Sequence, residues 1–245
     1  MAALRAADPG SQWFFHRRED GGEPVADLWF HSYDTVLADT VDRLGAGHGP
    51  DGSPSGWSSA AAPGVPAGLS GGSPAAGAPA VALASASSDL ALAVLRDGVP
   101  TADAQRSLAL LHLRTLAGLI PDGHRLGFLF LYWQAQATAL SPGERIAVAQ
   151  LADREIGERP WEPSGDFWPG EHAERAWRDY VRAAHALVAA ESAAGGPVNY
   201  LLFRHARETH ARLGVPAATE AFAARAVRAA LRAAPAGPVR ELQSA

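Results

Sequence analysis

Hydrophobic and polar positions are ordered most clearly near the N-terminus, where two aromatic runs flank a short connection rich in turn-forming residues. Residues 13–20 read WFFHRRED, residues 21–24 read GGEP and residues 25–31 read VADLWFH. Aromatic residues favour the pleated, half-buried surface of a sheet, whereas Gly and Pro favour turns. The pattern therefore predicts two neighbouring antiparallel strands, over residues 13–18 and 26–31.

Beyond these strands, apolar residues recur at helical spacing almost to the C-terminus. The first repeat lies at residues 36–44, and residues 126–133 are apolar on every face, so we expect that segment to be central to the core. The remaining predicted helices cover 80–95, a segment starting after Pro100, segments starting near 141 and 171, then 199–214 and a final one from 217. The fold class is therefore α+β, in which most of the later helices cover the N-terminal strands.

Residues 45–79 interrupt this pattern with Gly, Ser, Pro and Ala and few large side chains. Such a segment buries too little apolar area to offset the entropy lost on ordering, so we expect a flexible insertion that packs only near Trp57 and Leu69. Within it, residues 68–72 (GLSGG) formally match the nucleophile elbow of a hydrolase, but the elbow needs a preceding strand that this stretch does not favour. We expect residues 1–245 to form a single domain around the insertion.

Composition excludes several classes of function. The formal net charge of −5 gives no reason to expect nucleic-acid or membrane partners. No signal peptide and no apolar stretch long enough to cross a bilayer is evident, which predicts a soluble, cytoplasmic protein. The chain has no Cys, which excludes thiolate nucleophiles and Cys-ligated metals, and no Lys, which excludes a pyridoxal-phosphate Schiff base.

The N-terminal aromatic runs also carry a resemblance to a known family. Residues 13–20 resemble the Trp-Phe-Phe-x-Arg strand of the elimination domain of lantibiotic dehydratases and thiopeptide-type bacteriocin biosynthesis proteins, with Arg17 in register. The family's second strand carries one His and two Arg, and these positions hold Val25, Asp27 and Trp29 here. In the family the arginines are thought to hold an anionic glutamyl ester, as bidentate cations do. The resemblance implies the family's frame without its elimination site.

Two later segments extend the resemblance. Residues 212–214 (RLG) and Glu220 are similar to the family's closing signature, and Arg207 stands where the family has its functional His. Ser88 and Asp89 lie where the family has an Asp-Ser pair, in reversed order. Tyr200 and His205 stand near the lost His and are candidates for a different acid–base role.

This combination resembles the thiopeptide pyridine synthases, which reuse the elimination fold. The resemblance implies a formal aza-[4+2] cycloaddition between two dehydroalanines of a precursor peptide, followed by loss of water and leader peptide. It implies no metal and no cofactor, but a pocket that holds two alkenes in reactive geometry and supplies hydrogen-bond donors and a proton relay. Two alternatives stay open: a glutamate-elimination lyase of the same fold, and a non-catalytic partner that binds the precursor peptide.

The predicted site is a pocket walled by the first two strands and residues of the later helices. The candidate catalytic residues are Tyr200, His205, Ser88 and Asp89. The candidate substrate-binding residues are Trp13, His16, Arg17, Trp29, His31, Arg204, Arg207, Arg225 and Arg228.

The last predicted helix has a basic face formed by Arg225, Arg228 and Arg232, with no acidic residue among them. Arg204, Arg207 and Arg212 of the preceding helix extend it. By resemblance, this face docks the acidic leader of the precursor peptide; a solvated basic face on an acidic protein is the alternative. The sequence does not determine the precursor, the ring size or the oligomeric state.

Overall fold

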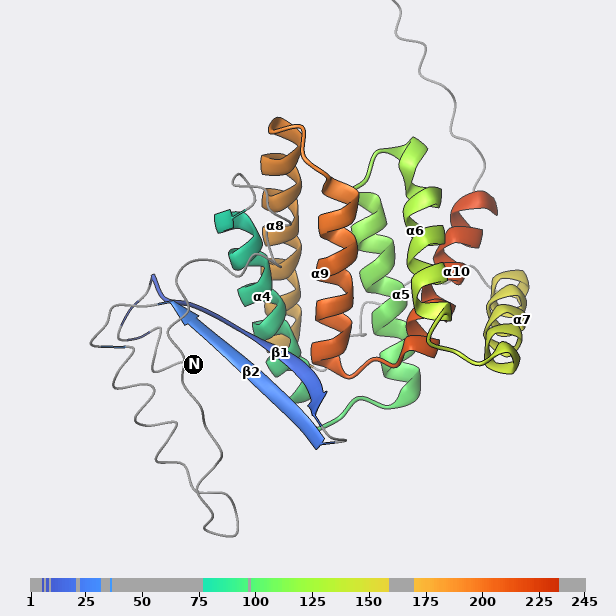
Figure 1. Cartoon of the computed structure of the whole chain (residues 1–245), viewed down its shortest axis with the longest axis horizontal. Coiled ribbons are helices and arrows are strands. Elements are labelled where there is room, and N and C mark those ends of the chain that lie inside the picture. Colours follow the sequence, from blue (N-terminus) through green and yellow to red (C-terminus); the bar gives the residue numbers. More distant parts are fainter. Residues whose placement is uncertain are drawn as a thin grey trace, which may run out of the picture. The chain divides into compact units, whose positions relative to one another are not determined.

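The structure is a computed structural model that describes residues 10–20, 23–31, 77–96, 98–158 and 170–233, together with Ala6, Asp8 and Val36. The chain forms two compact units, shown with the element labels in Figure 1. The first unit comprises residues 1–96 and 170–212, and the second comprises residues 97–169 and 213–245. The prediction of a single domain over 1–245 stays a prediction.

The first unit begins with an antiparallel hairpin of β1 (Gln12–Asp20) and β2 (Glu23–His31), which confirms the two predicted neighbouring strands. Trp13 pairs with Phe30, and the ladder continues to the pairing of Asp20 with Glu23. Glu23 therefore belongs to the second strand, although the sequence placed it in the connection. A two-residue connection, 21–22, is sufficient because antiparallel strands can be joined by tight hairpins.

The hairpin is buried on both faces near the start of β1, where Trp13, Phe14 and Phe15 are all enclosed. Phe14 stacks on Trp29 across the strands with ring centroids 4.8 Å apart, and Trp13 stacks on Phe15 on the other face at 6.3 Å. Burying side chains of this size stabilises a fold by about 1.5–3 kcal/mol each. These three consecutive aromatics therefore anchor the hairpin.

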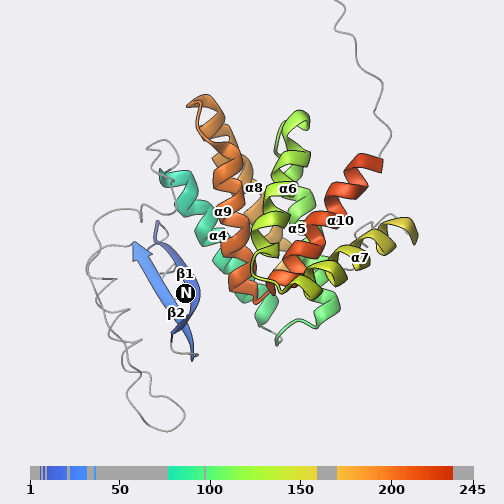
Figure 2. The ribbon, with the colours of Figure 1, turned by 45° about the vertical axis from the view of Figure 1, so that its right-hand side comes forward.

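Three helices complete the described part of the first unit: α4 (Gly77–Leu95), α8 (Glu171–Ala193) and α9 (Val198–Leu213), whose last residue falls in the second unit. Helix α4 packs against both β1 and α8, and the hairpin lies beside α4 in both views (Figures 1 and 2). We expected most of the later helices to cover the strands. In the first unit, the contacts to β1 described below come from two helices, α4 and α9.

The α4 helix corrects two sequence predictions. It starts at Gly77, so residues 77–79 are helical rather than part of the insertion; a proline in the first helical turn is tolerated because the N–H there has no helical partner. It is also long and apolar enough to cross a membrane by length and composition alone, with a mean hydropathy of 1.6 in an 18-residue window. Because 61% of that window is buried inside the protein, α4 fits a core helix of a soluble protein better than a membrane span.

The α8 helix ends at Ala193, just before Gly195-Gly196-Pro197, where Gly and Pro disfavour a helix. Gly195 has a φ of 68°, a left-handed conformation that a side chain would disfavour. The Gly196 N–H donates to the Glu191 carbonyl at 2.8 Å and the Gly195 N–H to the Ser192 carbonyl at 3.2 Å. These two bonds satisfy carbonyls that the helix end would otherwise leave open.

The second unit contains α5 (Ala102–Gly118), α6 (Asp122–Ala137), α7 (Pro142–Glu158) and α10 (Ala217–Ala233). Helix α10 contacts the other three, and its alanine-rich face and Phe222 are buried among them. Side chains cap the first turn of two of these helices. Thr101 accepts from the Ala104 N–H, while Ser141 and Glu144 bond reciprocally to each other's backbone N–H groups.

Helix α6 is less enclosed than predicted. Phe128, Leu129 and Tyr132 are buried, but Phe130 is 38% exposed and Leu131 is 59% exposed. The Tyr132 hydroxyl donates to the Glu220 carboxylate of α10, which provides the polar partner that a buried phenol requires. The expectation that residues 126–133 are buried on every face is therefore wrong.

Two predictions fall largely outside the described residues. They are the helix over 36–44, of which only Val36 is described, and the insertion up to residue 76, which includes the 68–72 motif.

Candidate functional site

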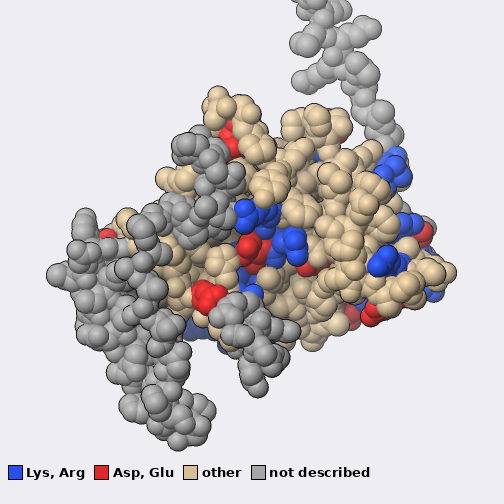
Figure 3. Space-filling view, viewed as in Figure 1, with Lys and Arg blue, Asp and Glu red and all other residues tan. Residues whose placement is uncertain are grey.

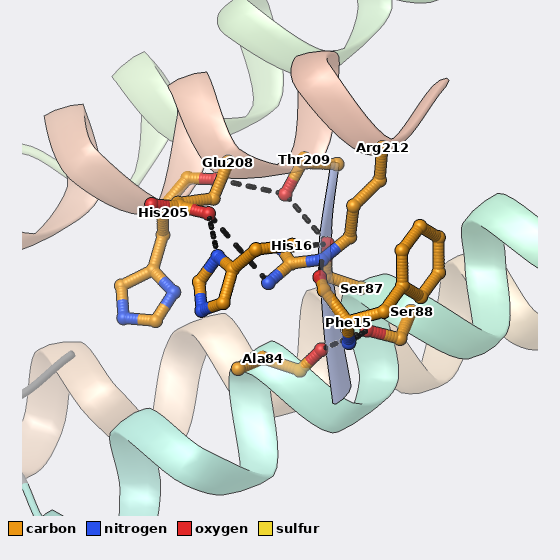
Figure 4. Close-up of polar contacts among 9 residues, drawn as sticks. All are labelled: Phe15, His16, Ala84, Ser87, Ser88, His205, Glu208, Thr209 and Arg212. Carbon is orange, nitrogen blue, oxygen red and sulfur yellow. Dashed lines mark hydrogen bonds and ion pairs between the residues drawn. The ribbon is translucent and has the colours of Figure 1, made fainter. Parts of the chain in front are cut away.

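The free edge of β1 is closed by side chains from two helices, α4 and α9. The Phe15 N–H donates to the Ser88 hydroxyl of α4 at 3.2 Å, and the Phe15 carbonyl accepts from Nε of Arg212 of α9 at 2.6 Å (Figure 4). An open strand edge carries N–H and C=O groups that need partners. Ser88 and Arg212 supply them here and hold β1 against both helices.

Arg212 is the centre of a buried hydrogen-bonded chain. Its Nη1 donates to the Ser87 hydroxyl at 3.0 Å, which lies 2.8 Å from the Thr209 hydroxyl, and Thr209 donates to the His205 carbonyl at 2.7 Å. Because Thr209 donates onward, the bond between the two hydroxyls runs from Ser87 to Thr209. The chain therefore has one consistent direction from Arg212 to the α9 backbone.

Burial changes the ionisation of this part of the protein. It lowers the pKa of Arg212 to about 10, against the opposing charge of Glu208. Burial also raises the pKa of Tyr180 of α8, despite a hydrogen bond with Thr209 and the nearby Arg212 charge, so Tyr180 stays a neutral phenol. Arg212 itself remains a cation at neutral pH.

Next to this chain, a hydrogen bond joins the side chains of His16 of β1 and Glu208 of α9. His16 Nδ1 lies 2.5 Å from Glu208 Oε2, and Arg212 Nη2 lies 3.8 Å from the same oxygen. The His16 and Glu208 side chains are 32% and 30% exposed, whereas the Arg212 side chain is fully enclosed. The pair therefore stands at the boundary between the buried chain and solvent.

Glu208 is held in its ionised form. Burial alone would raise its pKa, but the His16 hydrogen bond and the charges of His16, Arg212 and His205 outweigh burial and lower the pKa. Figure 4 draws both imidazole rings next to the Glu208 carboxylate. We call His16, Ser87, Glu208, Thr209 and Arg212 the polar cluster.

The outer face of α9 continues from the polar cluster toward the start of the helix. Tyr200 is 51% exposed, the Arg204 guanidinium lies 5.7 Å from the centre of the Tyr200 ring, and Arg207 is exposed. Charged side chains of both signs gather over α9 near the middle of the face in Figure 3. Tyr200, Arg204, Arg207 and Glu208 lie at helical spacing on one side, and we call them the α9 face.

The α9 face and His16 together offer three kinds of chemistry. A phenol donates a hydrogen bond while staying protonated at neutral pH, guanidinium groups bind carboxylates or developing negative charge, and an imidazole paired with a carboxylate transfers protons. Among the described residues, Arg204 and Arg207 make no ion pair. No group of three or more metal-binding side chains occurs in the described part of the chain.

The structure separates the predicted catalytic residues. Tyr200 lies in solvent near the start of α9, whereas His205 is buried, 2% exposed, on the same helix. Ser88 is fully buried, accepting from the Phe15 N–H and donating to the Ala84 carbonyl at 2.9 Å. Both hydrogen-bonding directions of Ser88 are thus used by the fold, and Asp89 beside it is half-buried.

The predicted substrate-binding residues of the strands also fall into two groups. Trp13 is 1% exposed and belongs to the core, and Trp29 is stacked between Phe14 and His31. Arg17 and His31 are exposed and His16 is paired with Glu208. Of these residues only Trp13 is enclosed; Trp29 and His16 are half-buried, so solvent reaches them in part.

The predicted basic face of the last helix is corrected by the structure. Arg225 makes two hydrogen bonds to the Asp153 carboxylate of α7, at 2.8 and 3.0 Å, so an acidic partner is present. Arg228 donates through Nε to the Leu126 carbonyl and lies over the Phe130 ring. Arg212 is buried in the first unit and cannot extend a surface patch.

Glu208, Ser87, Thr209 and Tyr180 were not among the predicted site residues. The only sequence signal was weak: Glu208 and Arg212 stand at i and i+4, an order that favours ion pairs on any helix. Their contacts with His16 and Ser87 span more than 120 residues of sequence.

Comparisons of the chain with models of protein families, with characterised proteins and with solved structures found no match.

Proposed function

We propose that the protein is a pyridine synthase of thiopeptide type. In this proposal it joins two dehydroalanines of a ribosomally made precursor peptide by a formal aza-[4+2] cycloaddition, then releases water and the leader peptide. The reaction needs no metal and no cofactor, and we place it in the cytoplasm.

One observation carries the proposal. The two segments on which the family resemblance rests, residues 13–20 and 212–214, meet in the fold through the 2.6 Å bond between Arg212 Nε and the Phe15 carbonyl. Both residues occupy positions that match the family's pattern. Their contact sets the first strand beside α9, whose outer face carries the polar groups that the chemistry requires.

The α9 face supports specific roles in this reaction. Arg204 and Arg207 bind peptide carbonyl or carboxylate groups, which orients the two alkenes for attack. The Tyr200 phenol donates to the amide oxygen as the iminol form develops. Arg17 and His31 of the hairpin extend the peptide-binding surface. The buried Trp13 holds the hairpin in shape and acts on substrate only through that shape, while the half-buried Trp29 stacks on Phe14 and His31.

The precursor's acidic leader is proposed to dock on α10 in the second unit. Burial, together with the nearby charges of Arg232 and Arg225, lowers the pKa of Arg228. A carboxylate bound there would relieve the repulsion. Because Arg225 is already paired with Asp153, Arg228 and Arg232 are the cations left for the leader.

A second candidate is a non-catalytic protein that binds the same precursor. The 51% exposure of Tyr200 favours it, because an open face with cations that solvent reaches suits peptide binding without chemistry. A glutamate-elimination lyase is disfavoured because Asp27, which stands where the family has an arginine, is an exposed anion.

The deciding experiment is incubation with a dehydroalanine-containing precursor peptide, followed by mass spectrometry. Release of leader peptide and loss of one water from the core is the expected result. Binding without any change in mass would favour the non-catalytic partner. Conversion of a glutamylated precursor to dehydroalanine would instead identify the lyase.

A further inference from the structure

The His16 ring has two nitrogens in different situations. Nδ1 faces the Glu208 carboxylate at 2.5 Å, and the ring is 32% exposed. An ionised carboxylate accepts hydrogen bonds and cannot donate them, so Nδ1 must carry the proton in the neutral ring. The lone pair of the neutral imidazole is then at Nε2.

We propose that His16 and Glu208 form a catalytic proton-transfer pair, in which Nε2 of His16 exchanges protons with the substrate and Glu208 orients the ring. The proposal rests on the function proposed above and names the residues that carry its water-loss step. It replaces the expectation that Tyr200 and His205 carry the acid–base steps, and it gives His16 a role beyond substrate binding.

The surroundings fit this role. Arg212 and His205 of α9 contribute positive charge that keeps Glu208 ionised. Tyr180 of α8 faces Arg212 as a neutral phenol, and α4 contributes the neutral hydroxyl of Ser87. Arg212 also binds the carbonyl of Phe15, the residue before His16, so it fixes the strand as well as the carboxylate. Arg212 is therefore a positioning residue for the pair.

The proposed step balances without an oxidant or reductant. In the cycloadduct, a ring carbon bonded to nitrogen carries a hydroxyl group. Imidazolium at His16 gives its Nε2 proton to that hydroxyl, and the C–O electron pair leaves with oxygen as water. The N–H electron pair of the ring nitrogen forms the C=N bond, and its proton returns to Nε2. The imidazolium is regenerated, and one water leaves.

The competing explanation is a hydrogen-bonded pair that only ties the hairpin to α9. Both explanations place the proton of the neutral ring on Nδ1, and they differ in the effect of His16 on turnover. A structural pair predicts that variants lose stability but retain kcat per folded molecule. A catalytic pair predicts that the variants lose kcat per folded molecule by a larger factor than they lose stability.

The first measurement is the tautomer of neutral His16, read from the ¹⁵N chemical shifts of the imidazole in the full chain. The expected result is the Nδ1–H form in the wild type and a shift toward the Nε2–H form in Glu208→Gln. An Nε2–H ring in the wild type would overturn the pair whatever the enzyme's activity, because Nε2 would hold no lone pair.

The second measurement is turnover of a dehydroalanine-containing precursor at several pH values. His16→Gln is expected to lower kcat by about 100-fold or more with a smaller change in KM. Glu208→Gln is expected to lower kcat less, because the ring keeps Nε2 but loses the carboxylate that orients it. His185→Gln, an exposed histidine on α8, is the matched control and should turn over as the wild type does.

Folding is checked by circular dichroism. If His16→Gln does not fold, Glu208→Gln and the addition of imidazole to His16→Ala provide the same test, since exogenous imidazole should restore part of the turnover. Wild-type kcat in folded His16→Gln would overturn the catalytic role while leaving the proposed function in place. A wild-type protein that never converts the precursor would overturn the proposed function and this role together, and the tautomer result would then describe a structural pair.

Discussion

At the scale of single residues, the guanidinium of Arg212 joins three elements of the first unit. It binds the Phe15 carbonyl of β1 and the Ser87 hydroxyl of α4, and it lies next to Glu208 of its own helix. A buried cation is costly unless each of these contacts is made. We therefore expect any side chain without several N–H donors on one planar group to destabilise the fold at position 212.

Replacing Arg212 should accordingly destabilise the protein. We expect Arg212→Met to lower the free energy of unfolding by on the order of 3 kcal/mol, because two buried acceptors lose their donor. Arg212→Lys should lose less, since it keeps the charge but cannot reach both acceptors. Urea denaturation measures both, and Arg182→Met, at an exposed ion pair of α8, is the control. Equal stability of Arg212→Met and Arg182→Met would contradict the buried role.

Glu208 makes stability depend on pH in a defined direction. Its pKa is lower in the folded protein than the ordinary value of 4.5, so ionisation stabilises the fold. That contribution is complete above about pH 4.5 and is lost as the pH falls through the lower folded value. Glu208→Gln should therefore cost on the order of 1 kcal/mol at neutral pH and progressively less below pH 4.5. Unfolding curves from pH 7 to pH 3 test this, and a constant difference would contradict it.

The exposed phenol of Tyr200 provides a third test at this scale. Tyr200→Phe keeps the ring that Arg204 stacks on and removes only the hydroxyl, so folding should be unchanged. If the phenol donates to the developing oxyanion, kcat should fall by about 10-fold or more. Turnover equal to that of the wild type would remove Tyr200 from the chemistry and restrict it to peptide binding.

At the scale of elements, helix ends follow local rules in this protein. The first turn of α5 is capped by Thr101, which accepts from the Ala104 N–H, and Asp103 lies in the same turn. The end of α8 relies on the left-handed Gly195. Such contacts span only a few residues, so they depend on the local sequence alone.

The cap of α5 is expected to contribute measurably to stability. Thr101→Ala should lower the free energy of unfolding by about 1 kcal/mol, because the Ala104 N–H loses its acceptor. Thr115→Ala, inside the same helix, removes the same hydroxyl without touching a cap and should be neutral or slightly stabilising, since alanine favours helices. Thermal denaturation measures the stability of both variants. If the two lose the same free energy of unfolding, the cap does not contribute to stability.

At the scale of the whole molecule, a net charge of −5 coexists with local clusters of arginine. Arg228 and Arg232 on α10 lie close enough to repel each other, and Arg225 beside them is neutralised by Asp153. A polyanionic peptide would be attracted to these cations despite the overall negative charge, because screening limits the range of interaction to about 8 Å at physiological salt.

Leader binding should therefore be salt-dependent. Arg228→Glu combined with Arg232→Glu is expected to weaken binding of the full-length precursor by about 10-fold or more, and the loss should shrink as salt is raised. Calorimetric titration at several salt concentrations measures this. Arg175→Glu combined with Arg178→Glu on α8 makes the same charge change elsewhere and is the control. If all these variants bind equally, the leader docks at another surface.

The sequence by itself determined the features that depend on neighbours in the chain. Two aromatic runs predicted the two strands, and helical spacing predicted α4 through α10. Each of these signals depends on backbone preferences and on contacts between residues a few positions apart. The basic side chains of α10 were also visible, but their partner Asp153, 72 residues away, was not.

Only the tertiary structure decided which polar residues meet. His16 and Glu208 are 192 residues apart, and Arg212 reaches Phe15 across 197 residues. It also decided that Ser88 and Trp13 are buried, that Phe130 and Leu131 are exposed, and that Arg212 lies inside rather than on the surface. These outcomes depend on how helices and strands pack. The hydrophobic pattern of a sequence predicts which face of an element is apolar, but it does not predict which element packs on that face. The candidate site was therefore predictable in its segments and unpredictable in its pairings.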